Sequence, residues 1–195
     1  MYPSPVRFHP WVGRDYNAAG FGGFKILILG ESHYSPKPED QFDSALTQKI
    51  FTHYAIGAKP LRFFKTLACL IAGAASRTAL SRETYLATWQ ACAFYNYVQD
   101  LLPAARMRPT PEMWDAAKEP FTHVLENLKP HIVLVAGKQL GWHIPNLPQG
   151  ITAIGMKHPS AFGFSYARAL QHIALQLPDG FDTARAVFAA HQDAD

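Results

Sequence analysis

Four short apolar runs recur along the chain, and each ends abruptly at a glycine or a polar residue: 24–29, 91–98, 131–137 and 151–156. Their apolar residues do not alternate with polar ones. This pattern is typical of central parallel strands, whose two faces are both covered by helices. We therefore predict four buried strands.

The segments between these runs carry apolar residues at helical spacing. In 60–74, for example, Leu61, Phe64, Leu67 and Ile71 would share one helix face. Strands that alternate with helices pair in parallel through right-handed crossovers. We predict one α/β domain over residues 1–195, with three α/β/α layers around a four-stranded parallel sheet. The expected helices are 43–56, 60–74, one beginning after a Ser81 cap, 111–128, a short one after 137, and 165–177 as the last.

The remaining segments lack a sustained period. Residues 1–23 hold several prolines, glycines and aromatic residues, which predicts a looped arm that packs on the domain. Residues 36–43 are rich in proline and acidic side chains and predict a loop.

Composition narrows the class of protein. A chain of 195 residues buries about 70% of its unfolded surface as one domain. Its 48% hydrophobic and 17% charged residues argue against intrinsic disorder. No apolar stretch resembles a membrane span or a signal peptide, so the expected location is the cytoplasm.

Cysteine content and charge limit the cofactors and partners. Cys69 and Cys92 are expected to be buried thiols, and two cysteines cannot build a four-cysteine zinc or iron–sulfur site. The histidines share no metal-ligand spacing, so we expect neither metal nor cofactor. A net charge of +3 permits binding to a polyanion without requiring it. Lys and Arg form no single cluster, so folding would have to assemble any nucleic-acid footprint.

Polar residues follow all four predicted strands. The carboxyl ends of parallel strands meet at one edge of a sheet, where ligands of open α/β proteins bind. We therefore expect one site made of both ends of the chain, from these four strand exits: Gly30-Glu31-Ser32, Asn96, Gly137-Lys138-Gln139 and His158-Pro159-Ser160.

In order, strand context and spacing, these exits resemble the motifs of the uracil-DNA glycosylase superfamily over residues 24–175. The matching segments are Gly30-Glu31-Ser32-His33-Tyr34, Phe94-Tyr95-Asn96-Tyr97-Val98, the Lys129-Pro130 strand ending at Gly137, and His158-Pro159-Ser160-Ala161-Phe162. In that family the first motif holds water-positioning and pocket residues. The resemblance implies that His158 stabilises the departing base or the cationic sugar, and that Asn96 reads the edge of a flipped base.

The resemblance also implies contacts with DNA around the flipped nucleotide. Ser160 would bind a phosphate, with Pro159 and Lys157 beside it, and Phe162 would fill the vacated position in the base stack. Tyr34 would guard the pocket against a 5-substituted pyrimidine, and His33 and Gly30 would line it. Phe42 and Phe51 are candidates for the aromatic that stacks on the base.

Ser32 departs from the pattern of the best-known uracil enzymes, which have a water-orienting aspartate at that place. A serine cannot act as a carboxylate base. Either Glu31 takes over this role, or the site relies on electrostatics with a weakly held water. The smaller serine also leaves room for a bulkier or modified pyrimidine.

The leading hypothesis is thus a monofunctional DNA glycosylase, active in base-excision repair or in defence against modified foreign DNA. Its partner would be DNA containing a damaged or modified base, and the protein would be a monomer. A rival is a small serine esterase, because Leu29-Gly30-Glu31-Ser32 resembles a Gly-Asp-Ser opening; however, Gly155 stands where such enzymes carry an aspartate before the late histidine. A third hypothesis is a catalytically weak protein that binds damaged DNA.

Overall fold

The computed structural model describes residues 2 and 5–192, and these form a mixed α/β fold around a five-stranded sheet with the order β1-β3-β2-β4-β5. Strands β2 to β5 run parallel, and they coincide with the four predicted runs. The α/β class is therefore confirmed, but the strand number is five. The strands are β1 (Trp11–Val12), β2 (Ile26–Gly30), β3 (Cys92–Asn96), β4 (Ile132–Ala136) and β5 (Thr152–Met156).

The additional strand, β1, comes from the segment predicted to be a looped arm. It pairs antiparallel with β3 at the edge of the sheet. Phe8, Tyr16 and Phe21 of the same segment are fully buried. The arm therefore contributes to the core, and a two-residue strand is too short to leave a periodic signal in the sequence. Residues 1, 3 and 4 of this arm, and 193–195 of the predicted domain, lie outside the described residues.

The helices differ from prediction at three places. Predicted helix 111–128 is divided at Ala117, because Pro120 has no amide hydrogen to continue the helical bonding. The predicted loop 36–43 contains a short 3₁₀ helix. Helix α7 is not the last: α8 follows and packs Phe181 and Phe188 against Phe21, with ring centroids 5.7 and 4.2 Å apart. The helices are η1 (Pro38–Phe42), α1 (Leu46–Tyr54), α2 (Arg62–Ala72), α3 (Arg82–Gln90), α4 (Pro111–Ala116), α5 (Lys118–Leu128), α6 (Lys138–His143), α7 (Tyr166–Ala174) and α8 (Phe181–Gln192).

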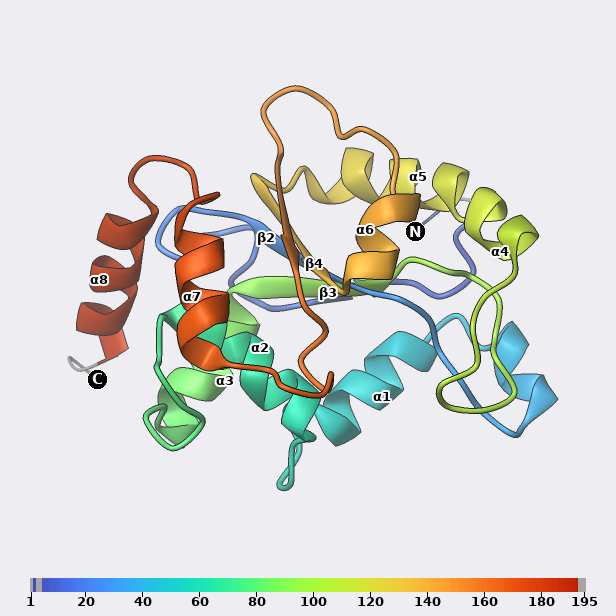
Figure 1. Cartoon of the computed structure of the whole chain (residues 1–195), viewed down its shortest axis with the longest axis horizontal. Coiled ribbons are helices and arrows are strands. Elements are labelled where there is room, and N and C mark those ends of the chain that lie inside the picture. The colour runs from blue at the N-terminus through green and yellow to red at the C-terminus, as the bar shows by residue number, and fades with distance from the viewer. Residues whose placement is uncertain (1, 3–4, 193–195) are drawn as a thin grey trace.

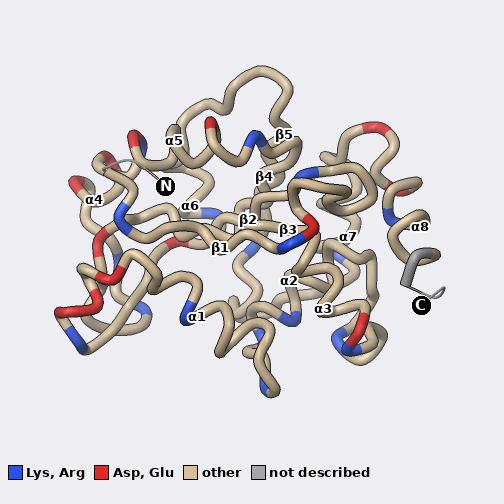
Figure 2. The backbone as a smooth tube through the Cα atoms, turned by 180° about the vertical axis from the view of Figure 1, so that it is seen from behind, with Lys and Arg blue, Asp and Glu red and all other residues tan. Residues whose placement is uncertain are grey.

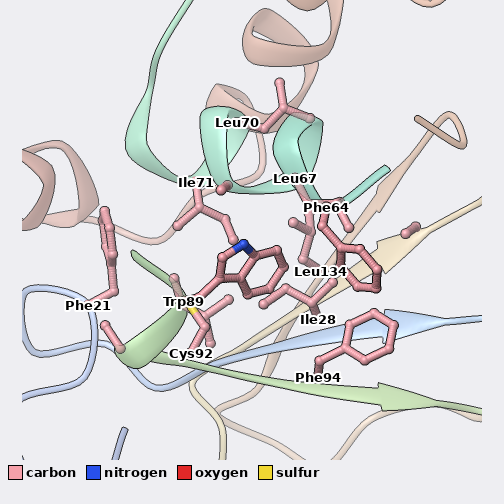
Figure 3. Packing of buried hydrophobic residues seen from close by; sticks show 14 of the residues in the cluster. Phe21, Ile28, Phe64, Leu67, Leu70, Ile71, Trp89, Cys92, Phe94 and Leu134 are labelled. Carbon is pink, nitrogen blue, oxygen red and sulfur yellow. The ribbon is translucent and has the colours of Figure 1, made fainter. Parts of the chain in front are cut away.

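Helices cover both faces of the sheet (Figure 1). Alternate residues of β2 show why: Ile26 and Ile28 join the core cluster that packs on α1–α3, α7 and α8, and Leu27 and Leu29 join the cluster under α4–α6. Trp89 lies at the centre of the first cluster, among side chains of α2, β2 and β3 (Figure 3). Cys69 and Cys92 are buried free thiols, as expected.

Strand β2 sits where the direction of winding reverses. It pairs with β3 on one side and β4 on the other. The connection from β2 to β3 passes through α1–α3 on one face, whereas the connection from β3 to β4 passes through α4 and α5 on the opposite face. A crevice at the carboxyl ends of such strands is the usual ligand site of doubly wound folds. Gly30-Glu31 and Gly137 leave the sheet at this point.

Among the helices that the structure describes, none combines the length and the apolarity needed to cross a bilayer.

Candidate functional site

The ends of β2 and β3 lie in direct contact. Gly30 is paired in register with Asn96, and a Cβ atom on residue 30 would overlap the Asn96 side-chain oxygen, Oδ1. Glycine is therefore needed at residue 30 so that the Asn96 side chain can lie across the end of β2. The two predicted pocket residues come together as expected.

A hydrogen bond to His33 fixes the Asn96 side chain. Asn96 Nδ2 donates to His33 Nδ1 at 3.0 Å, and the proton on His33 Nε2 is donated to Thr47 Oγ1 at 2.9 Å. The imidazole is only 2% exposed and meets the edge of Phe8 with ring centroids 5.1 Å apart. Both ring nitrogens are thus engaged. This differs from the prediction that His33 lines the pocket: it positions Asn96 instead.

Burial lowers the pKa of His33 to about 4, so the ring is neutral in the folded protein at neutral pH. The unfolded chain binds a proton near the ordinary pKa of 6.5, so the unfolded state holds more protons between these values. Stability should therefore fall as the pH falls. We expect a loss of about 3 kcal/mol from His33 alone between neutral pH and pH 4.

Urea unfolding of the wild type and of His33→Gln over this pH range measures this contribution. The variant is expected to show a flatter dependence of unfolding free energy on pH, whatever its absolute stability. Equal slopes would contradict the assignment of a buried neutral imidazole.

Glu31 is half-buried at the exit of β2. Its carboxylate lies 3.7 Å from Arg108 Nη1. Burial raises the pKa of Glu31 above its ordinary value, and the positive charges of Arg108 and His143 oppose this rise. A carboxylate in this setting can accept a proton more readily than an exposed one.

His158 lies at the exit of β5. Its Nδ1 accepts the backbone N–H of Ser160 at 3.1 Å, which places the proton of the neutral ring on Nε2. One face stacks on Phe63 of α2, with centroids 5.2 Å apart and an interplanar angle of 28°. Burial, and to a lesser extent the positive charge of Arg108, lower the pKa of His158. The ring is therefore a neutral hydrogen-bond donor at neutral pH.

The positive charge of Arg108 acts on both predicted catalytic side chains. It makes the ion pair with Glu31 and interacts electrostatically with His158, although these residues are far apart in sequence. The connection after β3 carries Arg106 and Arg108, and no sequence motif marks either as functional. Only the path of this loop brings Arg108 to the site.

His143 and Phe63 also belong to the site without having been predicted. The His143 ring stacks on Trp114 with centroids 4.2 Å apart and an interplanar angle of 7°. Its positive charge, when protonated, would stabilise the Glu31 carboxylate. Neither residue stands in a recognisable motif.

The loop after β5 is a tight turn with an aromatic tip. Lys157 Nζ donates to the Phe162 carbonyl at 2.6 Å, and the Ala161 N–H donates to the His158 carbonyl at 2.9 Å. Gly163 adopts a φ of +66°, which favours glycine. Phe162 is fully exposed, Ser160 is exposed and Pro159 is buried. A fixed backbone therefore presents Phe162 to solvent.

The other predicted residues have different surroundings. Tyr34 is 55% exposed beside Leu102, and Ser32 is half-buried, with no hydrogen-bond partner for its hydroxyl among the described residues. Phe42 is 88% exposed, whereas Phe51 is completely buried and stacks on Trp11 with centroids 4.0 Å apart. The prediction of Phe51 as a base-stacking aromatic is wrong, because core packing holds its ring.

Charge is spread widely over the molecule. Figure 2 shows Lys and Arg on all sides of the fold, with acidic residues spread among them. Among the side chains that the structure describes, no three from His, Cys, Asp or Glu come together in a way that could hold a metal ion. Any contact with a polyanion near the site would use single cations such as Arg108 and Lys157.

No protein-family model matches the chain, and no curated protein matches it. The resemblance to the uracil-DNA glycosylase superfamily thus rests on the sequence motifs alone.

Proposed function

We propose that the protein is a DNA glycosylase that hydrolyses the N-glycosidic bond of a flipped, uracil-like or modified base. One observation carries the proposal: Arg108 forms an ion pair with Glu31 at the exit of β2, and its positive charge also lowers the pKa of His158 at the exit of β5. The exposed Phe162 lies four residues after His158. A carboxylate base, a neutral N–H donor and an apolar wedge are the groups that this reaction needs.

The chemistry divides between the two residues. When the bond from C1′ to the base nitrogen breaks, both bonding electrons leave with the base. The Nε2–H of His158 would donate a hydrogen bond to the resulting anion. A water oxygen bonds to C1′, and its proton passes to the Glu31 carboxylate, which the positive charge of Arg108 keeps ionised. Glu31 then returns the proton to the departing base or to solvent.

Asn96 would recognise the base. One N–H of its amide is held by His33, so the other N–H and Oδ1 remain for the edge of a nucleobase. Oδ1 accepts no hydrogen bond from the described residues and lies over Gly30. A base that presents an N–H to this oxygen, as uracil and cytosine derivatives do, fits this arrangement.

The loop of residues 157–163 would contact DNA. Its backbone is held by internal hydrogen bonds while Phe162 projects into solvent. A base must leave the stack before its glycosidic bond can be reached, and an inserted apolar side chain offsets part of that cost. Ser160 is exposed on the same loop and available to a phosphate.

The esterase alternative has weaker support. In a serine hydrolase a carboxylate accepts the Nδ1–H of the catalytic histidine. Here Nδ1 of His158 accepts the Ser160 N–H instead, so the ring carries its proton on the opposite nitrogen. A serine-directed fluorophosphonate should leave Ser32 unlabelled.

The direct test is a panel of duplex and single-stranded oligonucleotides carrying uracil, hypoxanthine, 5-hydroxymethylcytosine or its glucosylated form. We expect release of a free base from at least one substrate, with alkali-labile abasic sites in the DNA. Binding to such DNA that survives His158→Ala, with no abasic product from any member, would favour the catalytically weak binding protein. If the protein neither releases a base from any member of the panel nor binds such DNA, the proposal is overturned.

Arg108 should determine the acidic limb of the pH profile. In Arg108→Gln the loss of positive charge raises the pKa of both Glu31 and His158. The active form has Glu31 ionised and His158 neutral. As the pH is lowered, kcat/KM of Arg108→Gln should therefore begin to fall at a higher pH than that of the wild type. The displacement should shrink with added salt, because the guanidinium is largely exposed.

Arg106→Gln is the matched control, since it removes the same charge from the same loop. An equal displacement in both variants would mean a general charge effect and no specific role for Arg108.

A further inference from the structure

A cavity lies away from the candidate site, between α2, the start of α3 and the connections that precede them. Its volume is about 180 Å³. Both connections lie along the lower edge of Figure 1. Lys65 and Cys69, four residues apart, line it from one face of α2. Phe63, which contacts His158, lies about 200° around the helix axis from Lys65, so the cavity is separate from the candidate site.

The charges around this cavity are all positive. Lys65, Arg77 and Arg82 line it, and no carboxylate does. None of the three takes part in an ion pair among the described residues. Glu83 stands in the first turn of α3 but does not line the cavity. Three cations that converge without a counter-ion repel one another, and a bound anion would relieve that repulsion.

Arg82 is held in place before any ligand arrives. Its Nη2 donates to the carbonyls of Ile56 and Gly57 at 2.5 and 2.8 Å, and its guanidinium lies 5.4 Å from the centre of the Tyr85 ring. The Tyr85 hydroxyl donates to the Ala55 carbonyl at 2.7 Å and so fixes the same connection. Nε and Nη1 of Arg82 remain free of partners in the described structure. A planar guanidinium with two unused N–H donor groups is suited to binding phosphate oxygens.

Two further features point the same way. Arg77 and Lys65 line the cavity together with Cys69, and their positive charges oppose the rise that burial causes in the pKa of its thiol. Ser81 caps α3 by accepting the Thr84 N–H at 3.0 Å. The first-turn amides of this nine-residue helix stand beside Arg82, where the helix dipole favours negative charge.

From these observations we propose that the cavity lined by Lys65, Arg77 and Arg82 binds the phosphoryl group of a phosphate ester. The volume equals that of about six water molecules, which exceeds one phosphate and leaves room for part of the ester group. The source of that group is either a backbone phosphate of DNA or a free phosphorylated metabolite. The proposal does not depend on the glycosylase function.

Calorimetric titration of the full chain with sodium phosphate, and then with pyrophosphate, tests the site at constant ionic strength. We expect a phosphate dissociation constant on the order of 1 mM, with tighter binding of pyrophosphate. Lys65→Gln/Arg77→Gln should weaken both by at least about tenfold. Lys59→Gln is the control, because residue 59 lies between the lining residues Ala58 and Pro60 without lining the cavity itself.

No measurable phosphate binding by the wild type, or an equal loss in the double variant and in Lys59→Gln, would overturn the proposal. Amide chemical shifts of Arg82 and Glu83 provide an independent readout, since they should move with phosphate in the wild type and stay unchanged in the double variant.

Binding of an unmodified DNA duplex then separates the two sources. If the double variant also binds the duplex more weakly than Lys59→Gln does, the phosphate belongs to DNA. If only phosphate and pyrophosphate binding are lost, the ligand is a free phosphate ester.

Discussion

His158→Ala is expected to lower kcat for base release by about 10²–10³-fold, and Glu31→Gln by about 10²–10⁴-fold. In the proposed mechanism, the first change removes the N–H donor to the departing anion, and the second removes the group that takes the proton from water. The double variant should lose less than the product of the two effects, because both residues act in one transition state. Single-turnover kinetics on the best substrate of the panel gives these rates.

Matched substitutions on α5 serve as controls. His123→Ala removes a partly exposed histidine from α5, and Glu119→Gln removes an exposed carboxylate from the same helix. Both should keep the wild-type rate. If Glu31→Gln and His158→Ala also keep it, the assignment of the catalytic residues fails.

Phe51→Ala is expected to lower the free energy of unfolding by about 3–5 kcal/mol. The ring is completely buried; it stacks on Trp11 and meets Trp89 edge-on with centroids 4.9 Å apart. Truncation leaves a cavity among aromatic rings. The cavity cannot close fully, because the surrounding side chains are already closely packed. Chemical denaturation with fluorescence or circular dichroism measures the loss.

Phe42→Ala is the control for Phe51→Ala: it removes the same kind of side chain from an exposed position. The Phe42 ring is 88% exposed at the end of η1, so its removal should change the unfolding free energy by less than about 0.5 kcal/mol. Similar losses in the two variants would contradict the packing described around Phe51. A loss of DNA affinity in Phe42→Ala alone would identify it as a contact to DNA.

Some parts of the fold follow directly from local pattern. The four parallel strands are uninterrupted apolar runs, and they must be buried wherever they pair. The caps of α3 and α4 are equally local, because the Ser81 and Thr110 hydroxyls accept N–H groups only three residues ahead. Features of this kind need no knowledge of distant contacts, so they are readable in the linear chain.

Other elements depend on partners far away in sequence. Strand β1 exists because Trp11 and Val12 reach the edge of β3 about 80 residues later. Helix α8 packs on Phe21 from the opposite end of the chain. Neither has enough local periodicity to be recognised alone. Their stability comes from long-range burial of apolar surface, which sequence spacing does not record.

The candidate site divides in the same way. By itself, the sequence determined that Glu31, Asn96 and His158 would stand near the carboxyl ends of strands, because the apolar runs 24–29, 91–98 and 151–156 each end within two residues of them. Only the tertiary structure decided that Arg108 pairs with Glu31, that the buried His33 bonds to Asn96, and that three cations line one cavity. The physical reason is that strand ends are set by local hydrophobicity, whereas ion pairs, buried hydrogen bonds and cavities arise from where folded loops meet.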